Sequence, residues 1–270
     1  MRLVRLVMIG DVMGGPGLEA LELMLPGLIK EYNIDFVSVN GENCAEGFGL
    51  TETAFNRILA AGADVVTSGN HVWEKRDFWP ILQTEKQILR PANYPSPSPG
   101  TGWLCIEKAG LTWIAVNLQG REFMGAIDCP FLCFDKISGN FPEKTGEASP
   151  IIFVDFHAES SSEKEALAYY LDGRASLIAG THTHVQTADQ RILPKGSGYI
   201  TDLGMTGNTD SVIGMDPDIC LARSRKQVLY RMECAAKADK SEIQGVMAEI
   251  DASTGKAVSI RRLNETVFHV

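Results

Sequence analysis

Short apolar runs alternate with segments of helical periodicity over the first 70 residues of the chain. The runs cover residues 3–9, 36–39 and 64–67, and each is followed by glycine or a polar cluster. The intervening segment 17–32 carries apolar residues at helical spacing, and a second helix is expected to begin after Thr51. This alternation predicts a βαβαβ unit, in which parallel strands are joined by crossover helices.

The pattern changes in the middle of the chain and then returns. Residues 91–102 contain four prolines and predict a loop. The segments expected to be regular after this loop are a hairpin (103–107 and 111–117), a strand (151–156), a helix (161–171), a strand (176–179) and two C-terminal strands (244–251 and 256–263). We therefore predict a single domain over residues 1–270, with irregular insertions near 119–149 and 186–215. Either insertion could form a lid or a subunit contact, so the sequence leaves open whether the chain is a homo-oligomer.

Composition limits the classes of partner. The formal net charge of −9 and the pI near 5.1 argue against a broad nucleic-acid-binding surface, although a bound cation could still attract a small anionic substrate. The six cysteines have no CxxC pair and are expected to be reduced core residues. The apolar N-terminal run is broken by Arg5 and has no cleavage site, and no segment is long enough to span a membrane. We expect a cytoplasmic protein.

Candidate chemistry is concentrated where the predicted strands end. Five strands, ending near residues 9, 40, 68, 156 and 180, are each followed at once by polar side chains. These side chains are Asp11, Glu42, Asn43, Asn70, His71, His157, His182 and His184. Functional groups of parallel sheets gather outside the carboxyl ends of the strands, so we expect all eight to share one crevice.

The residue types indicate a metal centre. Imidazole and carboxylate suit zinc, iron and manganese, and amide oxygens are tolerated by the same ions. Three of the histidines together with Asp11, Glu42, Asn43 and Asn70 are too many ligands for one tetrahedral ion, but they suit a pair of ions. Two divalent cations, offset by Asp11, Glu42 and a bridging hydroxide, would leave about one positive charge, which favours a phosphoester substrate.

Each motif has an ordinary structural explanation when it is considered alone. Asp11 could be a turn or helix-cap residue, Glu42 a solvated loop carboxylate, and His157 a buried histidine with a hydrogen-bond partner. The motif from Gly180 to His184 is harder to explain in this way, because two histidines separated by one residue can point in the same direction. The coincidence of all the motifs at strand ends favours a functional site.

At these residues the sequence resembles the calcineurin-like metallophosphoesterases. The corresponding runs are Gly10-Asp11, Gly41-Glu42-Asn43, Gly69-Asn70-His71, Phe156-His157 and His182-Thr183-His184. Two departures from the superfamily pattern, Met13 in place of a histidine and Glu42 in place of the bridging aspartate, are typical of the YmdB-like phosphodiesterases. The similarity extends from about residue 4 to residue 265, and only the segment 208–211 is less typical.

The resemblance implies a four-layer α/β/β/α sandwich with a di-iron or di-manganese centre, and zinc suits the same ligands. It implies that Asp11, Glu42, Asn43 and His184 hold one ion and that Glu42, Asn70, His157 and His182 hold the other. It further implies hydrolysis of 2′,3′- and 3′,5′-cyclic nucleotides by a metal-bridging hydroxide, with His71 as the general acid.

Three other functions remain open at this level. The same centre could serve a phosphomonoesterase or nucleotidase, because both classes of substrate use the same ions. A regulatory protein could bind a nucleotide with little turnover, although the complete ligand set argues against this. The histidines could also hold a single structural zinc ion.

Overall fold

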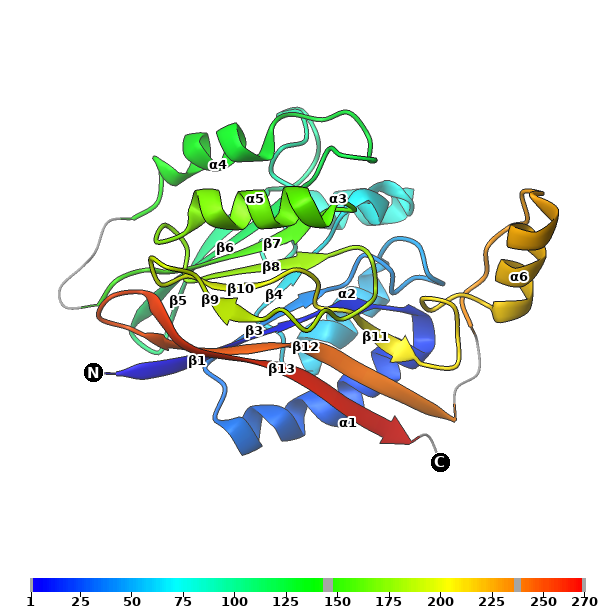
Figure 1. Ribbon diagram of the computed structural model, residues 1–270, viewed down its shortest axis with the longest axis horizontal. Coiled ribbons are helices and arrows are strands. Elements are labelled where there is room, and N and C mark those ends of the chain that lie inside the picture. Colours follow the sequence, from blue (N-terminus) through cyan, green and yellow to red (C-terminus); the bar gives the residue numbers. More distant parts are fainter. Residues whose placement is uncertain (1, 143–147, 236–238, 269–270) are drawn as a thin grey trace.

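The computed structural model describes residues 2–142, 148–235 and 239–268, and it has four layers (Figure 1). Two β-sheets face one another, helices α1 and α2 cover the outer face of the first, and α4 and α5 cover the outer face of the second. The predicted α/β/β/α sandwich is therefore confirmed.

The first sheet is built on the predicted βαβαβ unit. Its elements are β1 (Leu3–Ile9), α1 (Gly14–Tyr32), β3 (Phe36–Asn40), α2 (Glu52–Ala60) and β4 (Val65–Thr67). Strands β1, β3 and β4 are parallel, as predicted. Four strands extend the sheet on the other side of β1. Three come from later in the chain, β12 (Lys240–Asp251) with β13 (Lys256–Phe268), and β11 (Met205–Asn208), and the fourth is the short β2 (Asp11–Val12).

The second sheet has the order β5-β6-β7-β8-β10-β9. Its strands are β5 (Trp103–Lys108), β6 (Leu111–Gln119), β7 (Ile151–His157), β8 (Leu177–Thr181), β10 (Gly198–Ile200) and β9 (Arg191–Ile192). The predicted hairpin is β5–β6, and the parallel neighbours β6, β7 and β8 lie at the centre. Helix α5 (Ser161–Leu171) begins where the Ser160 side chain accepts a hydrogen bond from the Glu163 backbone N–H.

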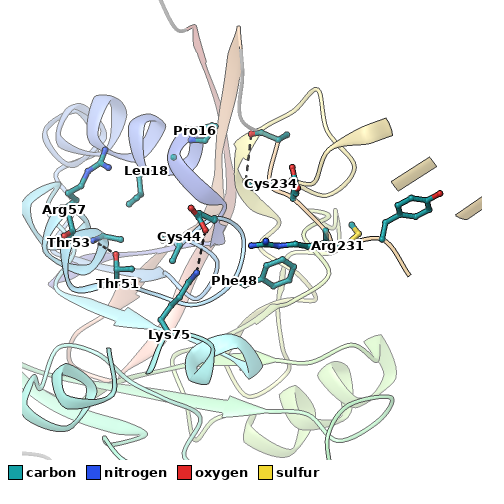
Figure 2. A pocket seen from close by; sticks show the side chains of 18 of the residues that line it. Pro16, Leu18, Cys44, Phe48, Thr51, Thr53, Arg57, Lys75, Arg231 and Cys234 are labelled. Carbon is teal, nitrogen blue, oxygen red and sulfur yellow. Dashed lines mark hydrogen bonds and ion pairs between the residues drawn. The ribbon is translucent and has the colours of Figure 1, made fainter. Parts of the chain in front are cut away.

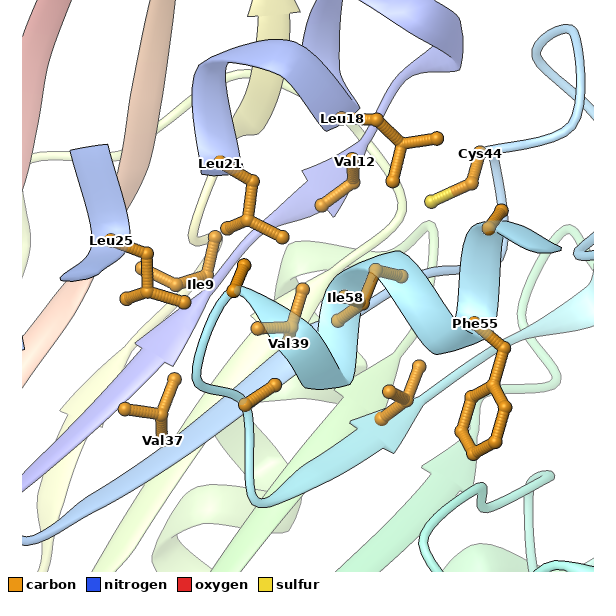
Figure 3. Close-up of a cluster of buried hydrophobic side chains, with 14 of the residues drawn as sticks. Ile9, Val12, Leu18, Leu21, Leu25, Val37, Val39, Cys44, Phe55 and Ile58 are labelled. Carbon is orange, nitrogen blue, oxygen red and sulfur yellow. The ribbon is translucent and has the colours of Figure 1, made fainter. Parts of the chain in front are cut away.

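Alternation along the strands produces three cores. In β1, Val7 and Ile9 pack under α1 and α2 (Figure 3), whereas Leu6 and Met8 face the second sheet. Successive side chains of a strand point to opposite faces, so one apolar run supplies two cores. A third core lies between the second sheet and α5.

Several boundaries differ from the prediction. Helix α1 begins at Gly14 rather than at residue 17. The segment 119–149, predicted to be irregular, contains α4 (Pro130–Ser138), although residues 143–147 lie outside the described part. The segment 186–215 contains β9, β10 and β11, and three helices were not predicted from the sequence: α3 (Trp79–Thr84), α4 and α6 (Pro217–Lys226). Within the described residues, no helix is long and apolar enough to cross a bilayer.

Candidate metal centre

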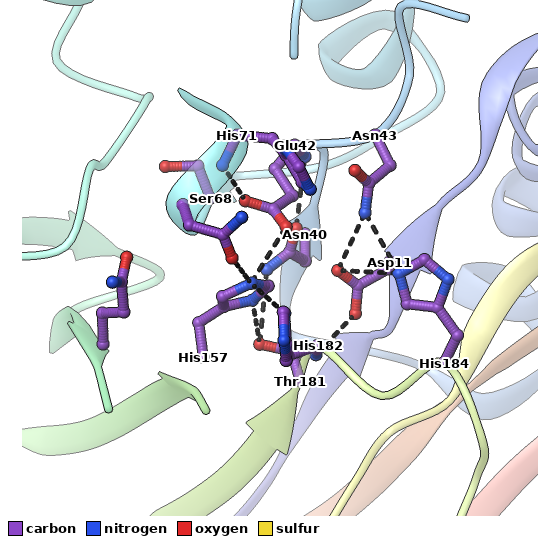
Figure 4. Close-up of polar contacts among 12 residues, drawn as sticks. Asp11, Asn40, Glu42, Asn43, Ser68, His71, His157, Thr181, His182 and His184 are labelled. Carbon is purple, nitrogen blue, oxygen red and sulfur yellow. Dashed lines mark hydrogen bonds and ion pairs between the residues drawn. The ribbon is translucent and has the colours of Figure 1, made fainter. Parts of the chain in front are cut away.

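The eight predicted side chains all lie at or just after strand ends, as expected. Asp11 follows β1, Glu42 and Asn43 follow β3, and Asn70 and His71 follow β4. His157 is the last residue of β7, and His182 and His184 follow β8. The five strands belong to two sheets rather than to one, and the site lies where the carboxyl ends of both sheets meet (Figure 4).

In one group, three side chains surround the Nε2 atom of the fully buried His157. Glu42 Oε1 lies 2.9 Å from this nitrogen. Asn70 Oδ1 and His182 Nδ1 each lie 3.0 Å from it. Glu42, His157 and His182 also form the one group of at least three histidine, cysteine or acidic side chains, among the described residues, whose ligand atoms are close enough to hold a metal ion.

This convergence leaves a buried polar atom unsatisfied. When His157 is neutral and its proton is on Nδ1, the buried Glu42 Oε1 accepts no hydrogen bond, although it lies 2.9 Å from His157 Nε2. A single imidazole nitrogen cannot satisfy a carboxylate oxygen, an amide oxygen and a second imidazole at once. A buried charged acceptor without a donor is costly, so the donor set fits a cation better than it fits the side chains alone.

A second group contains Asp11, Asn43 and His184. Asn43 Nδ2 lies 3.3 Å from Asp11 Oδ1 and 3.1 Å from His184 Nε2. His184 Nε2 is 3.8 Å from Asp11 Oδ1. The two groups are linked because the backbone N–H of His182 donates to Asp11 Oδ2 over 3.2 Å.

Hydrogen bonds at Nδ1, the ring nitrogen that faces away from the site, orient His157 and His184. Thr181 donates its hydroxyl proton to Asp155 Oδ1 over 2.6 Å, so the Thr181 oxygen is left to accept from His157 Nδ1 at 3.0 Å. His184 Nδ1 donates to the backbone oxygen of Ile213 over 2.8 Å. Each bond places the proton on Nδ1 and leaves the Nε2 lone pair directed at the site, as in metal-bound histidines.

The electrostatics of the first group indicate where a proton resides in the absence of metal. Burial would raise the pKa of Glu42, but the facing His157 outweighs this effect and lowers the pKa to about 2. Burial would lower the pKa of His157, but Glu42 raises it to about 9. Burial and the neighbouring His157 together lower the pKa of His182 to about 3. A protonated His157 therefore supplies part of the positive charge that a metal cation would place beside Glu42.

The loop that carries two of the histidines is strained and held from below. His182 and His184 have φ values of 101° and 64°, which residues other than glycine rarely adopt. Asp202 accepts hydrogen bonds from both the backbone N–H and the hydroxyl of Thr183, the residue between them. The buried Lys164 pairs with the same carboxylate over 2.7 Å. This support maintains a backbone conformation that would otherwise relax.

The ring of His71 does not join either group. Its backbone N–H donates to Glu42 Oε2 over 3.0 Å, and its ring packs edge-on against Phe48 at a centroid distance of 5.0 Å. The His71 side chain is 26% exposed, whereas that of His157 is fully buried. His71 is therefore held beside the site with its ring accessible to a ligand.

Sequence reasoning missed a second ring of polar residues beneath the site. Asp155 accepts hydrogen bonds from Asn40, Thr67 and Thr181, and all four residues are buried. Each lies within or at the end of an otherwise apolar strand. A polar residue in a buried apolar run was the signal that could have identified them, because such groups must have hydrogen-bond partners.

The pattern for the YmdB-like protein family matches residues 7–263. The chain belongs to the YmdB-like family. The 2′,3′-cyclic-nucleotide 2′-phosphodiesterase of Bacillus subtilis (strain 168) is 44% identical to it over 260 residues, which cover 96% of both chains. The crystal structure of a novel phosphatase from Mycoplasma pneumoniae superposes with a TM-score of 0.89 at 31% identity, and the match covers 98% of this chain and 94% of the other.

A more distant structure shows the fold alone. The NAD nucleotidase of Haemophilus influenzae has a TM-score of 0.62 at 12% identity, and the match covers 99% of this YmdB-like chain and 56% of the other. The family match and the B. subtilis relative, rather than this structure, confirm the predicted YmdB-like resemblance over nearly the whole chain. Met13, at the position where the wider superfamily is expected to carry histidine, is a buried core residue that packs against Gly207 and Gly214.

Proposed function

We propose that this YmdB-like protein is a metal-dependent phosphoric diester hydrolase that acts on 2′,3′- and 3′,5′-cyclic nucleotides. The observation that carries the proposal is the convergence of three potential ligand atoms on His157 Nε2, with the buried Glu42 Oε1 left without a donor. The name of the B. subtilis relative supports the 2′,3′ substrates. A site for small phosphodiesters also agrees with the net charge of −9, which disfavours a broad nucleic-acid surface.

The proposed cofactor is a pair of divalent iron or manganese ions, with zinc as a chemically suitable alternative. Asp11, Asn43 and His184 would hold the first ion, and the group around His157 (Asn70, His157 and His182) would hold the second. Glu42 would contribute to both. Asn43 now directs Nδ2 toward Asp11 and His184, and a half-turn of its amide presents the oxygen instead. When bound, the ions would polarise the phosphoryl group and lower the pKa of water.

The proposed general acid is His71. A cyclic phosphodiester is opened when water adds to phosphorus and one ribose oxygen departs, and that oxygen needs a proton. His71 is held by its backbone bond to Glu42 while its ring stays partly exposed, so it can face a substrate without ligating a metal. Histidine is the side chain that most often acts as a general acid or base in enzymes.

Replacing His71 by asparagine tests this role. We expect kcat on a cyclic nucleotide to fall by about 10²- to 10⁴-fold, because general acid catalysis contributes about that much. Metal content, measured by elemental analysis, should stay that of the wild type. Asp77→Asn is the matched control, since Asp77 is an exposed residue of the same segment and should leave kcat unchanged. A His71→Asn variant that loses metal would identify His71 as a ligand, and unchanged turnover would remove it from the mechanism.

A substrate panel tests the reaction class. Purified metal-loaded protein should hydrolyse 2′,3′-cyclic AMP and 3′,5′-cyclic AMP with larger kcat/KM values than the corresponding monoesters. Faster hydrolysis of the monoesters would identify a nucleotidase. Nucleotide binding without hydrolysis across the panel would identify a regulatory protein.

We also propose that the chain forms a single domain and works in the cytoplasm. The C-terminal strand β12 lies between β1 and β11, so the two ends of the chain share one sheet. All six cysteines are free, which agrees with a reducing compartment. Self-association stays a prediction that sedimentation of the purified protein would test.

A further inference from the structure

A basic arm projects from the molecule beside the metal centre. We define the arm as residues 217–232, which comprise α6 and the segment that follows it. The arm contains four basic residues, Arg223, Arg225, Lys226 and Arg231, and one acidic residue, Asp218, in a chain whose net charge is −9. Helix α6 has no buried residue and stands away from the two sheets (Figure 1). The arm therefore presents positive charge without contributing to the core.

The base of the arm touches the metal centre. Ile213, just before the arm, accepts the hydrogen bond that orients His184. The chain returns after the arm at Cys234, which forms an isolated β-bridge with Met215. Ala235 then donates to Gly214 over 2.9 Å. The arm thus leaves the body and rejoins it next to a proposed ligand.

A cavity of about 1020 Å³ lies between the arm and the loop that follows Glu42 and Asn43. Cys44, Ala45 and Phe48 belong to its loop side, and Arg223, Tyr230 and Arg231 line it from the arm. Figure 2 shows Arg231 extending from the arm toward Cys44, with Phe48 beside it. The Phe48 ring also contacts the ring of His71, so the cavity adjoins the proposed general acid.

The lining of this cavity is suited to a polyanion with flat rings. Four cationic and two acidic side chains line it, which reverses the sign of the chain's overall charge. Arg57 is already paired with Glu22, and Lys75 lies 3.8 Å from Glu46. Within the described part of the chain, however, the guanidinium groups of Arg223 and Arg231 have no ion-pair partner. Phosphates pair with such groups, and bases stack on exposed aromatic rings.

We propose that this cavity and the basic arm bind a short single-stranded oligonucleotide whose terminal cyclic phosphate reaches the metal centre. The inference rests on the proposed function and names a longer substrate for the same site. The cavity volume of about 1020 Å³ lies just above the range of about 300–1,000 Å³ for pockets that hold drug-sized ligands, so the cavity has room for a ligand of that size or larger. The acidic body would repel a long nucleic acid, so the local positive charge favours a short one.

The reaction would be the same as for a mononucleotide. One water molecule adds to phosphorus, one P–O bond to the terminal ribose breaks, and the proton goes to the departing ribose oxygen. The product is an oligonucleotide that ends in a phosphomonoester. The arm would act only on binding, through phosphates upstream of the reacting one.

The test compares kcat/KM for a tetranucleotide ending in a 2′,3′-cyclic phosphate with kcat/KM for 2′,3′-cyclic AMP. In the wild-type protein we expect kcat/KM for the tetranucleotide to be at least about tenfold larger than kcat/KM for 2′,3′-cyclic AMP. This ratio should fall with rising salt, because each phosphate contact to a single strand contributes about 0.7 to the slope of log affinity against log salt concentration. In Arg223→Glu/Arg231→Glu the ratio should fall about tenfold or more and the slope by about 1.4, the value for two contacts. The charge-retaining variant Arg223→Lys/Arg231→Lys should keep most of the ratio.

The control variant is Lys86→Glu/Arg262→Glu, which changes net charge equally at two exposed residues outside the cavity lining and should leave the ratio unchanged. A wild-type ratio near one, or an equal loss in the control variant, would overturn the inference while leaving the proposed function intact. If Arg223→Glu/Arg231→Glu dissociates an oligomer in sedimentation without changing the ratio, the arm binds a second copy instead. Hydrolysis of neither substrate would overturn the proposed function itself.

Discussion

At the scale of single residues, the centre depends on the proton positions of its histidines. The Thr181 hydroxyl gives its proton to Asp155 and can therefore only accept from His157 Nδ1. Glu42 faces the other nitrogen of the same ring and raises the pKa of His157 to about 9. In metal-free protein at neutral pH, His157 consequently carries a proton that a metal ion must displace.

This displacement predicts a pH-dependent metal affinity. Below pH 9 the proton competes with the cation, so affinity should rise about tenfold per pH unit for one competing proton. Between pH 6.5 and pH 8.5 the dissociation constant for Mn²⁺, measured by calorimetry, should therefore fall about 100-fold. The heat of binding should also depend on the ionisation enthalpy of the buffer. A dissociation constant that is flat over this range would show that no protonated ligand is displaced.

The hydrogen bond between Thr181 and His157 gives a second prediction at this scale. Thr181→Val keeps the shape of the side chain but removes the oxygen that accepts from His157 Nδ1. Loss of such an orienting partner typically costs about 10- to 100-fold in metal affinity. Thr112→Val is the control, because Thr112 forms an exposed hydrogen bond with Glu107 on β5, away from the site. If Thr181→Val bound metal with wild-type affinity, Thr181 would not be needed to orient His157.

At the scale of elements, the ends of the strands determine where the site lies, and close packing of the backbone against its side chains determines its shape. Sequence periodicity predicted the strands that carry the proposed ligands, because an apolar run followed by a polar cluster is a local signal. It could not predict that these strands divide between two sheets, since strand pairing depends on contacts far apart in sequence. The predicted insertion 119–149 contains α4, whose nine residues are too short a segment for helical periodicity to be recognised.

Alanine substitutions at two glycines distinguish the effect of close packing from the effect of helix propensity. A Cβ on Gly69 would lie 2.2 Å from His157 Cδ2, so Gly69→Ala should displace the imidazole and reduce metal binding. A Cβ on Gly27 in α1 would meet nothing within 4 Å, so Gly27→Ala should stabilise the protein by about 1 kcal/mol through helix propensity. Thermal unfolding and metal titration of both variants distinguish the effects. Normal metal affinity in Gly69→Ala would contradict the packing at the centre.

At the scale of the whole molecule, the chain closes on itself around the site. Strand β12 inserts antiparallel beside β1, with Ile9 opposite Gly245, and carries β11 and β13 with it. The C-terminal strands were predicted from their alternation and turn, but their position next to β1 was not, because no local pattern specifies a partner more than 200 residues away. The family resemblance predicted the four-layer sandwich, but it did not predict this strand pairing either.

The central claim is that this YmdB-like chain holds two catalytic metal ions that share Glu42. The most direct test is elemental analysis of anaerobically purified wild-type protein and Glu42→Ala, with 2′,3′-cyclic AMP hydrolysis measured on the same samples. We expect two iron or manganese ions per wild-type chain, with both the second ion and activity lost in the variant. One zinc ion per wild-type chain, or full metal content and activity in Glu42→Ala, would contradict the claim.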